Sequence, residues 1–372
     1  RSRNMSDLQG VGVTISFNKS LESNVSNSTH CDHINTSSHI LFMLVYSLVF
    51  LVGLILNGFT LKVYFCQAQQ QASSSVTIYL KNLAAADFLI SLCLPIRITN
   101  YASSSVSIRQ VYCNFGASAF YLNMYASILF MGYIAANRYL KIVHPLGTHV
   151  LQTVRAAHII SIVTWVFLLA ITTTYIILSI LTQEPLQSIP ITVSCDVLHS
   201  KHLSLFYKII HSSSAAIFLL VLVSLVFFYY NTSRRLSEAQ QRQPASSSSK
   251  KLAKSRRNML VLVSVFCVCF VPYHLVRLPY AFLKMQCSQV FFYLKEITIM
   301  VSVLNVCLDP LIIYFIFCKA FRAQLSLRKV FSSTQTARDG ANSERRSSNE
   351  QMSSMKIDRK TSLSTTKQTS ML

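Results

Sequence analysis

Residues 266–280 read FCVCFVPYHLVRLPY, an apolar run that contains residues costly to place inside a membrane. Pro272 lies near its centre, and because proline removes a backbone hydrogen bond, it kinks the helix that contains it. His274 and Arg277 follow within one turn, and an ionisable residue at membrane depth is a candidate functional residue. The stretch therefore predicts a kinked membrane-spanning helix with a cation beside a cavity, which is typical of a membrane receptor that binds an acidic ligand.

The composition of the whole chain also points to the bilayer. Of the 372 residues, 52% are hydrophobic and 13% are charged, and the mean hydropathy is +0.42; soluble domains carry about 25% charged residues. The formal charge is +21. Because the basic residues cluster in loops and a tail beside apolar segments, they indicate cytoplasmic faces and anionic membrane lipid rather than a nucleic acid polymer. The ten cysteines show no metal-ligand spacing, so we expect no metal site of that kind.

Seven apolar segments are each close to the roughly 20 residues that span a bilayer as a helix. They are predicted at 40–66, 76–101, 112–142, 157–182, 203–230, 258–284 and 290–317. Lysines and arginines gather in alternate short loops between them, and such loops stay in the cytoplasm. The sequence therefore predicts an all-α membrane protein, a seven-transmembrane helix bundle over 40–317, with the N-terminus outside and the C-terminus inside.

The polar segments outside the spans differ in composition. Residues 1–39 are predicted to be a glycosylated extracellular N-terminus, because they hold the sequons at Asn4, Asn18, Asn24, Asn27 and Asn35. A Ser/Asn-rich disordered tail is the simpler reading, and it is compatible with an extracellular location. The loop at 231–257 is rich in Ser, Gln, Lys and Arg, so we expect it to be flexible. A short amphipathic membrane-surface helix is predicted at 318–329. Residues 330–372 are predicted to be a disordered cytoplasmic tail, where serines behind a basic pair are candidate sites for kinases and arrestin.

Short motifs follow one another through the spans in a specific order. They are 53–57 (GLILN), 83–87 (LAAAD), Cys113, 137–139 (NRY), Trp165, 266–272 (FCVCFVP) and 305–310 (NVCLDP). Each motif alone is weak, but together at these spacings they are specific. Over about residues 40–328 the chain resembles the rhodopsin-like (class A) G-protein-coupled receptors.

Further residues are similar to one branch of that family, the purinergic (nucleotide) receptors. This branch holds the ADP and UDP-sugar receptors, their orphan relatives and the lysophosphatidylserine receptors. The similarity is carried by 78–82 (IYLKN), 120–125 (FYLNMY), 269–280 (CFVPYHLVRLPY), 295–298 (KEIT) and 305–310.

The resemblance implies a multi-pass plasma-membrane receptor and not an enzyme. We expect activation by an acidic extracellular ligand, such as a nucleotide or nucleotide sugar, and coupling to an inhibitory-type heterotrimeric G protein. An acidic lysophospholipid such as lysophosphatidylserine is the alternative ligand, since its phosphate would use the same cations. A transporter or channel is a remote alternative, because the sequence shows neither internal repeats nor broken helices. It also shows no nucleophile–base pair that would indicate an enzyme.

The ligand site that the resemblance implies combines cations with an aromatic ring. Its residues are Tyr121, His274, Arg277 and Lys295, with Glu296, Arg97, Lys208 and Lys284 as neighbours. These residue types suit an acidic ligand: arginine binds phosphate with two donors, lysine adds a point charge, and tyrosine offers a ring and a hydroxyl. For Arg277 two other readings stay open, a snorkelling helix-end residue and a partner for Glu296.

The resemblance also implies two disulfides on the extracellular, oxidising side. Cys113 is expected to pair with Cys195 in the second outside loop, and Cys31 with Cys287 in the third. No covalent cofactor is expected.

A deeper polar cluster is expected to hold an allosteric sodium ion. Its members are Asp87, Asn123, Ser127, Asn305 and Asp309. Two buried carboxylates repel each other unless a cation or a proton intervenes. A water-bridged network with one protonated carboxylate is therefore the alternative.

The cytoplasmic ends of the spans carry the residues that would couple to the G protein and switch the receptor. They are Asn137, Arg138, Tyr139, Tyr229, Phe266, Phe270, Pro272 and Tyr314. The family usually has an acid before Arg138, where this chain has Asn137, and the inner end of the sixth span is basic. Because both restraints on Arg138 are absent, we predict raised basal signalling. Tyr314 stands one residue later than the corresponding tyrosine of the family. On a regular helix its side chain is therefore rotated by about 100° from the usual face, unless a local bulge restores that face. The fifth span also lacks a proline.

Overall fold

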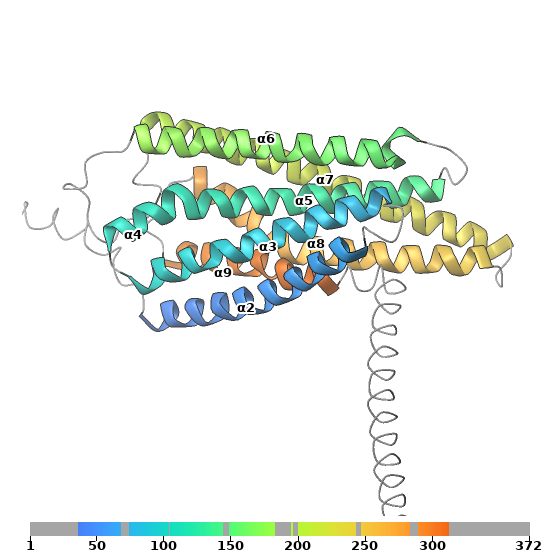
Figure 1. Ribbon diagram of the computed structural model, residues 1–372, viewed down its shortest axis with the longest axis horizontal. Helices are drawn as coiled ribbons and strands as arrows, with labels where there is room; N and C mark the ends of the chain where they lie inside the picture. The colour runs from blue at the N-terminus through green and yellow to red at the C-terminus, as the bar shows by residue number, and fades with distance from the viewer. Residues whose placement is uncertain are drawn as a thin grey trace, which may run out of the picture. The chain divides into compact units, whose positions relative to one another are not determined.

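The computed structural model describes residues 36–67, 74–103, 105–143, 149–182, 195, 200–242, 247–282 and 289–311. The elements in these ranges are all helical (Figure 1). The helices are α2 (Thr36–Gln67), α3 (Ser75–Ala102), α4 (Val106–Val111), α5 (Ala117–Val143), α6 (Val154–Leu181), α7 (Lys201–Arg242), α8 (Ser247–Phe282) and α9 (Gln289–Val303). A π-helical turn, Tyr112–Gly116, joins α4 to α5, and a 3-10 turn, Val150–Gln152, precedes α6. They belong to one compact unit, Arg1–Ile312.

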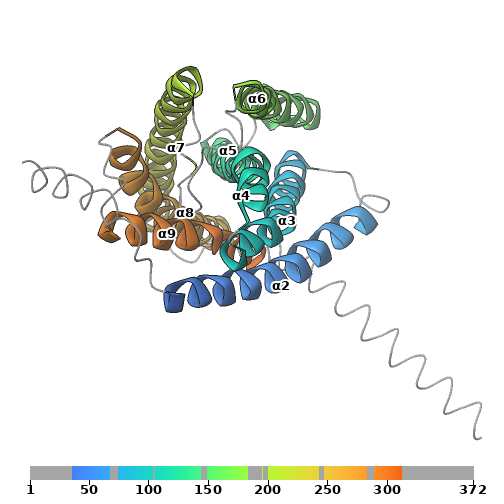
Figure 2. The same ribbon diagram turned by 90° about the vertical axis from the view of Figure 1, so that its left-hand side faces the viewer.

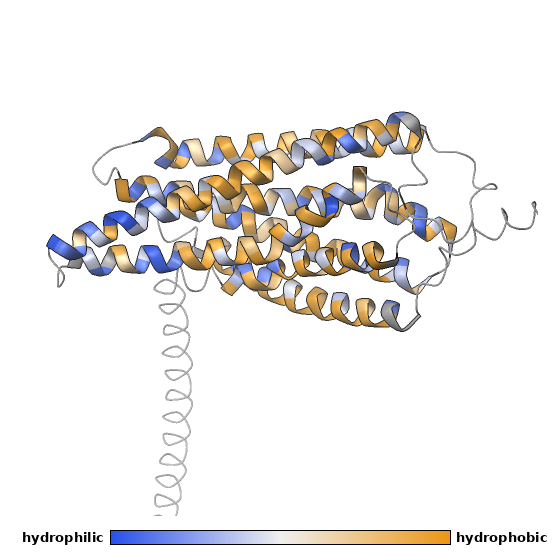
Figure 3. Ribbon diagram, turned by 180° about the vertical axis from the view of Figure 1, so that it is seen from behind, coloured by the Kyte–Doolittle hydropathy of each residue, from blue (hydrophilic) through white to orange (hydrophobic). Residues whose placement is uncertain are grey.

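Seven helical spans in the described ranges are long and apolar enough to cross a membrane. The predicted all-α, seven-transmembrane fold is therefore confirmed. Hydrophobic residues cover most of each span, and polar residues gather where α7 ends and α8 begins (Figure 3). Large apolar side chains such as Leu44, Leu220 and Leu275 are 64–69% exposed, which fits a surface that faces lipid tails instead of water.

The central helices of the bundle are α3 and α5. Helix α3 packs against α2, α5 and α6, while α5 also contacts α6, α7 and α8. Further neighbours are α7 with α8, α8 with α9, α6 with α7 and α2 with α9. Figure 2 shows this arrangement along the helix axes, with α2 lying beside α3 and α6 on the opposite side. Each helix thus buries one face on its neighbours and leaves the other to the membrane.

Polar links between helices fix this packing. The Asn57 side-chain amide donates to the Val306 carbonyl oxygen (2.8 Å) and thereby ties α2 to the seventh span. At Gly53, one turn away, an added Cβ atom would lie 2.5 Å from a Val306 methyl carbon, so only glycine permits this close approach. On the other side, Trp165 Nε1 of α6 donates to Asn82 Oδ1 of α3 (2.9 Å). The motif residues of the first, second and fourth spans therefore act as structural contacts.

Several helix boundaries differ from the predicted ones. The prediction of a flexible loop at 231–257 is wrong: α7 continues to Arg242 and α8 already begins at Ser247. Gln, Arg, Lys and Ala are good helix formers, and Arg234 pairs with Glu238 one turn on (N–O 3.2 Å). The first helix begins at Thr36, before the expected 40. The seventh span is interrupted at Leu304, whose N–H bonds to the Val301 carbonyl oxygen (3.2 Å) in a tightened turn.

Several predicted features lie outside the described residues. They are the five sequons, Cys31, Cys287, Lys284, Tyr314, the helix at 318–329 and the tail at 330–372. These remain predictions from the sequence.

Candidate functional site

One end of the bundle is marked by a disulfide between Cys113 and Cys195. Cys113 belongs to the π-helical turn before α5, and its Cα atom lies 5.5 Å from that of Cys195. The predicted pairing of these two cysteines is confirmed. Because disulfides form on the oxidising side of the membrane, we call this the outer end, and the end that carries Arg138 the inner end.

Arg277 of α8 is held in an aromatic site at the outer end. Its side chain is buried, and its Nε donates to His211 Nε2 on α7 (3.2 Å) while Nη2 donates to the Tyr207 hydroxyl. Its guanidinium carbon lies 5.7 Å from the ring centroid of Tyr121 on α5 and 5.4 Å from that of Tyr207. Arg277 is therefore positioned by three helices and is not a snorkelling helix-end residue.

Tyr280 joins Arg277 to Lys295, the first cation of the seventh span. Its ring centroid lies 5.5 Å from the Arg277 guanidinium carbon and 5.0 Å from Lys295 Nζ. The Phe292 ring also lies beside Lys295, with its centroid 4.9 Å from Nζ. Cations over aromatic faces are stabilised by the ring quadrupole. The two cations predicted for an acidic ligand thus lie on one aromatic residue.

Glu296 pairs with cations from two helices. Its Oε2 accepts from Arg97 Nη2 of α3 (2.7 Å) and from the Tyr101 hydroxyl, and its Oε1 lies 3.2 Å from Lys295 Nζ. The side chains of Arg97 and Glu296 are only 6% and 7% exposed, so this is a buried ion pair. Aromatic rings surround the Arg97 guanidinium, with centroids 4.9 to 5.9 Å from its central carbon: Tyr46, Tyr112, Phe120 and Tyr101.

His274, another predicted ligand residue, is engaged by the helices around it. Its Nδ1 bonds to the Phe270 carbonyl oxygen (2.8 Å), which can only accept, so Nδ1 carries the proton. Its Nε2 bonds to the Tyr125 hydroxyl (3.0 Å), and its ring stacks on Phe218 with centroids 3.8 Å apart. The structure therefore places His274 one turn below Arg277, in contact with α5 and α7. The predicted neighbour Lys208 is half-buried on α7.

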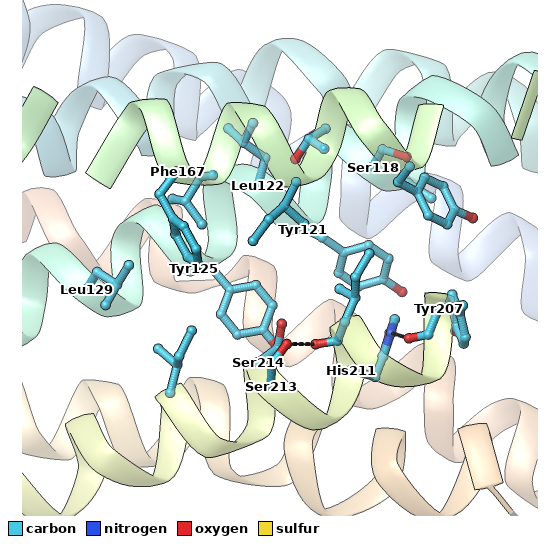
Figure 4. A pocket seen from close by; sticks show the side chains of 17 residues that line it. Ser118, Tyr121, Leu122, Tyr125, Leu129, Phe167, Tyr207, His211, Ser213 and Ser214 are labelled. Atoms are coloured by element: carbon cyan, nitrogen blue, oxygen red, sulfur yellow. Dashed lines mark hydrogen bonds between the residues drawn. The ribbon is translucent and has the colours of Figure 1, made fainter. Parts of the chain in front are cut away.

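A cavity opens beside this cluster, between α5, α6 and α7. The space open to a water-sized sphere is about 70 Å³, several times what one buried water needs. Figure 4 shows Tyr121 and Tyr125 reaching from α5 towards α7, where Tyr207, His211 and Ser214 complete the polar side. The α6 side of the cavity is mainly apolar: Phe167, Leu168, Ile171, Thr172 and Tyr175.

In the deep polar cluster, hydrogen bonds join Asp87, Ser127 and Asn305, which come from three different spans. Asp87 Oδ1 accepts from Ser127 Oγ (2.9 Å) and from Asn305 Nδ2 (3.4 Å). Asp309, four residues after Asn305, is fully buried. Within the described ranges, Asp87 Oδ2, both Asp309 oxygens and Asn123 Oδ1 are buried and have no hydrogen-bond partner. Hard oxygen ligands that still lack a donor suit a small cation. This donor set fits a sodium ion.

The inner end holds the predicted coupling residues. Asn137 is buried, and its amide donates to Ser75 Oγ of α3 (2.9 Å). Arg138, the next residue, is half-buried on α5. The Tyr139 ring stacks on Phe228 of α7 with centroids 4.9 Å apart. Asn137 and Tyr139 therefore contact two different helices, α3 and α7.

The other predicted switch residues lie on α7 and α8. The Phe266 and Phe270 rings pack edge to face one turn apart, with centroids 5.3 Å apart. Pro272 follows inside α8, and Tyr229 is half-buried near the inner part of α7. Phe266 also stacks on Phe218 of α7 (5.6 Å), the ring on which His274 stacks. A continuous aromatic path thus leads inward from His274.

Sequence reasoning missed His211 and Tyr207, which orient Arg277, and Tyr280, which joins the two cations. A signal for His211 was present, because it is an ionisable residue in the middle of an apolar span, the same rule that singled out His274. Tyr207 and Tyr280 gave no such signal, since tyrosines near the ends of spans are common membrane anchors.

Comparisons with known proteins agree with this geometry. The family model of the 7 transmembrane receptors (rhodopsin family) matches residues 56–314. Purinoceptor 14 of Bos taurus is 34% identical over 81% of this chain and 88% of its own length. G-protein coupled receptor 87 of Mus musculus is 31% identical over 83% and 84%. Lysophosphatidic acid receptor 6 of Mus musculus is 27% identical over 78% and 84%.

These relatives are receptors, not enzymes, and their family binds small molecules outside the cell and couples to G proteins inside it. The resemblance to the purinergic branch is confirmed, and one of these relatives is named for a lysophospholipid, lysophosphatidic acid. The chain therefore belongs to the rhodopsin family of G-protein-coupled receptors, as a multi-pass plasma-membrane protein of the branch that holds purinergic and lysophospholipid receptors.

Proposed function

We propose that this receptor is activated by an acidic extracellular ligand, a nucleotide or nucleotide sugar, and couples to an inhibitory-type G protein. The observation that carries the proposal is that Arg277 and Lys295 meet on the ring of Tyr280. Two cations beside one aromatic residue can bind a phosphate while a base or sugar packs nearby. Tyr121 offers a second ring next to Arg277 for stacking.

Ligand binding would reach the G protein through α8. An agonist that draws Arg277 and Lys295 together binds one arrangement of α8 and α9 better than others. This difference in affinity shifts the receptor population towards that arrangement. Pro272 lacks the N–H of a regular helix, so α8 bends there more easily. Motion at Pro272 then moves Phe270 and Phe266, which contact α7.

The test is a panel of ligands on membranes that contain the full chain. We expect nucleotides or UDP-sugars to raise GTP exchange, and pertussis toxin, which inactivates inhibitory-type G proteins, to abolish the response. Arg277→Ala and Lys295→Ala should each raise the half-maximal concentration at least tenfold. Arg155→Ala removes an exposed arginine of α6 and should leave nucleotide binding unchanged. A receptor that ignores every nucleotide and UDP-sugar contradicts the proposal.

A lysophospholipid is the second candidate, favoured by the cavity between α5, α6 and α7. Its wall on α6 is apolar, and Phe167 in that wall is 46% exposed on the surface that faces lipid. An acyl chain would fit along such a wall while its phosphate reached Arg277. Lysophosphatidylserine and lysophosphatidic acid therefore belong in the same panel, and a response to them alone selects this candidate.

Two further parts of the function are proposed with it. A sodium ion bound among Asp87, Ser127, Asn305 and Asp309 would stabilise one receptor state, because it balances two buried carboxylates. In the tail, serines behind Arg345 and Arg346 would accept phosphate from kinases and then bind arrestin. The first proposal is tested by sodium dependence, the second by replacing Ser347 and Ser348 with alanine and measuring arrestin recruitment.

A further inference from the structure

Glu296 is the acidic residue that faces the outer cations in the described ranges. The other acids there are Asp87 and Asp309 in the deep network and Glu238, which is exposed on the inner part of α7. Both Glu296 oxygens face cations: Oε2 accepts from Arg97 (2.7 Å) and Oε1 lies 3.2 Å from Lys295 Nζ. The carboxylate thus occupies positions that a ligand phosphate would take on the same cations.

The surroundings make this negative charge effective. The side chains of Arg97, Glu296 and Lys295 are 6%, 7% and 12% exposed, so little water screens the charge. Arg97 is held among aromatic rings, and the Tyr101 hydroxyl donates to the same Glu296 oxygen as Arg97. The carboxylate is therefore fixed in place and cannot turn away when a ligand arrives.

Glu296 is also connected to the proposed phosphate site. Lys295 contacts its carboxylate on one side and lies 5.0 Å from the Tyr280 ring centroid on the other. The Arg277 guanidinium lies over the same ring, 5.5 Å from the centroid. A charge on Glu296 therefore acts directly on Lys295, one of the two cations that would bind phosphate.

We propose that Glu296 is an internal counter-anion that makes this site select ligands by their negative charge. It lowers the positive charge facing the ligand by one unit and so favours weakly charged phosphates over highly charged ones, because repulsion against a fixed charge grows with ligand charge. This inference rests on the proposed function, which places the ligand phosphates on Arg277 and Lys295.

The test compares ligands that differ only in phosphate number. Binding of uridine mono-, di- and triphosphate to the purified full chain is measured at one ionic strength. In Glu296→Gln, the preference for triphosphate over monophosphate should rise about tenfold, because the triphosphate carries about two more negative charges and Glu296 no longer repels them. Glu238→Gln neutralises an acid of the same type away from the site and should leave the preference unchanged. An unchanged preference in Glu296→Gln overturns the proposal.

A second pair of variants separates charge from folding, because Glu296→Gln leaves Arg97 buried without its carboxylate. Arg97→Gln and the double variant Arg97→Gln/Glu296→Gln both lack that arginine. The preference for triphosphate should rise about tenfold from the first to the second, and the double variant should match the wild type, since it loses one charge of each sign. A double variant that prefers triphosphate no more than Arg97→Gln overturns the proposal.

Inorganic phosphate, pyrophosphate and tripolyphosphate, measured in parallel, distinguish this inference from the proposed function. If the proposed function fails and the inference holds, nucleotides neither bind to the receptor nor activate it. Glu296→Gln still shifts the binding preference in the inorganic series towards tripolyphosphate. If the function holds and the inference fails, nucleotides activate the wild type and neither series shifts. A wild-type receptor that binds neither series overturns the inference too.

Discussion

Asn137 of α5 donates a hydrogen bond of 2.9 Å to Ser75 Oγ at the start of α3, and a second of 3.3 Å to the Leu151 carbonyl oxygen. An amide at this position therefore ties α5 to α3 and to the turn before α6. The carboxylate that usually precedes this arginine would instead offer a negative charge to Arg138. The hydrogen bonds of Asn137 give the inner end a structural link without that charge.

The first prediction is that Asn137→Asp lowers ligand-free signalling. The new carboxylate can accept from Ser75 and attract the Arg138 guanidinium, which stabilises the inactive arrangement by about 1 kcal/mol, or roughly fivefold in basal activity. GTP exchange without ligand, normalised to surface expression, measures this. Ser75→Ala removes the partner of Asn137 without adding charge and should not lower basal exchange. Equal basal exchange in wild type and Asn137→Asp would show that the missing acid has no such effect.

Much of this architecture could be predicted because the membrane simplifies the sequence signal. A bilayer forces each backbone to satisfy its own hydrogen bonds, so apolar length alone located the seven spans. The family resemblance that the ordered motifs carry then implied the Cys113–Cys195 disulfide. The Arg97–Glu296 pair could not be predicted, because its partners are 199 residues apart and depend on how α3 and α9 pack. Tertiary contacts with α5 and α7 likewise determine that His274 stacks on Phe218.

The second prediction separates a nucleotide from a lipid. Tyr121→Ala should weaken nucleotide binding about tenfold or more, because stacking on an aromatic ring contributes about 1–3 kcal/mol per base. Leu168→Ala, in the α6 wall of the cavity, should leave nucleotide binding almost unchanged and weaken lysophospholipid binding several-fold through lost apolar contact. Competition binding on purified receptor measures both ligands. The opposite pattern, nucleotide binding that is weakened by Leu168→Ala but not by Tyr121→Ala, would argue against a nucleotide that stacks on the Tyr121 ring.

The third prediction concerns the contact between the first and seventh spans. Gly53→Ala should destabilise the receptor by about 1–3 kcal/mol, because overpacking forces side chains or backbone to move, and the added Cβ atom would lie 2.5 Å from Val306 Cγ1. Thermal unfolding of purified receptor gives Tm. Gly58→Ala is the matched control, since the nearest atom to its Cβ, in Phe88, is 3.5 Å away. The variant Gly53→Ala/Val306→Ala should lose less stability than the sum of its parts; simple additivity would mean that the two residues do not clash.

The fourth prediction is a sodium response that depends on Asp87. If a sodium ion balances the carboxylates of Asp87 and Asp309, sodium chloride should raise the Tm of ligand-free receptor relative to choline chloride at equal ionic strength, because an ion that binds only the folded state stabilises it. Asp87→Asn should abolish this rise, since it removes one of the two charges that attract the ion. Glu238→Gln, which neutralises an exposed acid on α7, should keep it. A wild type that unfolds at the same temperature in both salts would instead support the water-bridged network, in which a proton shared by the two carboxyl groups takes the place of the cation.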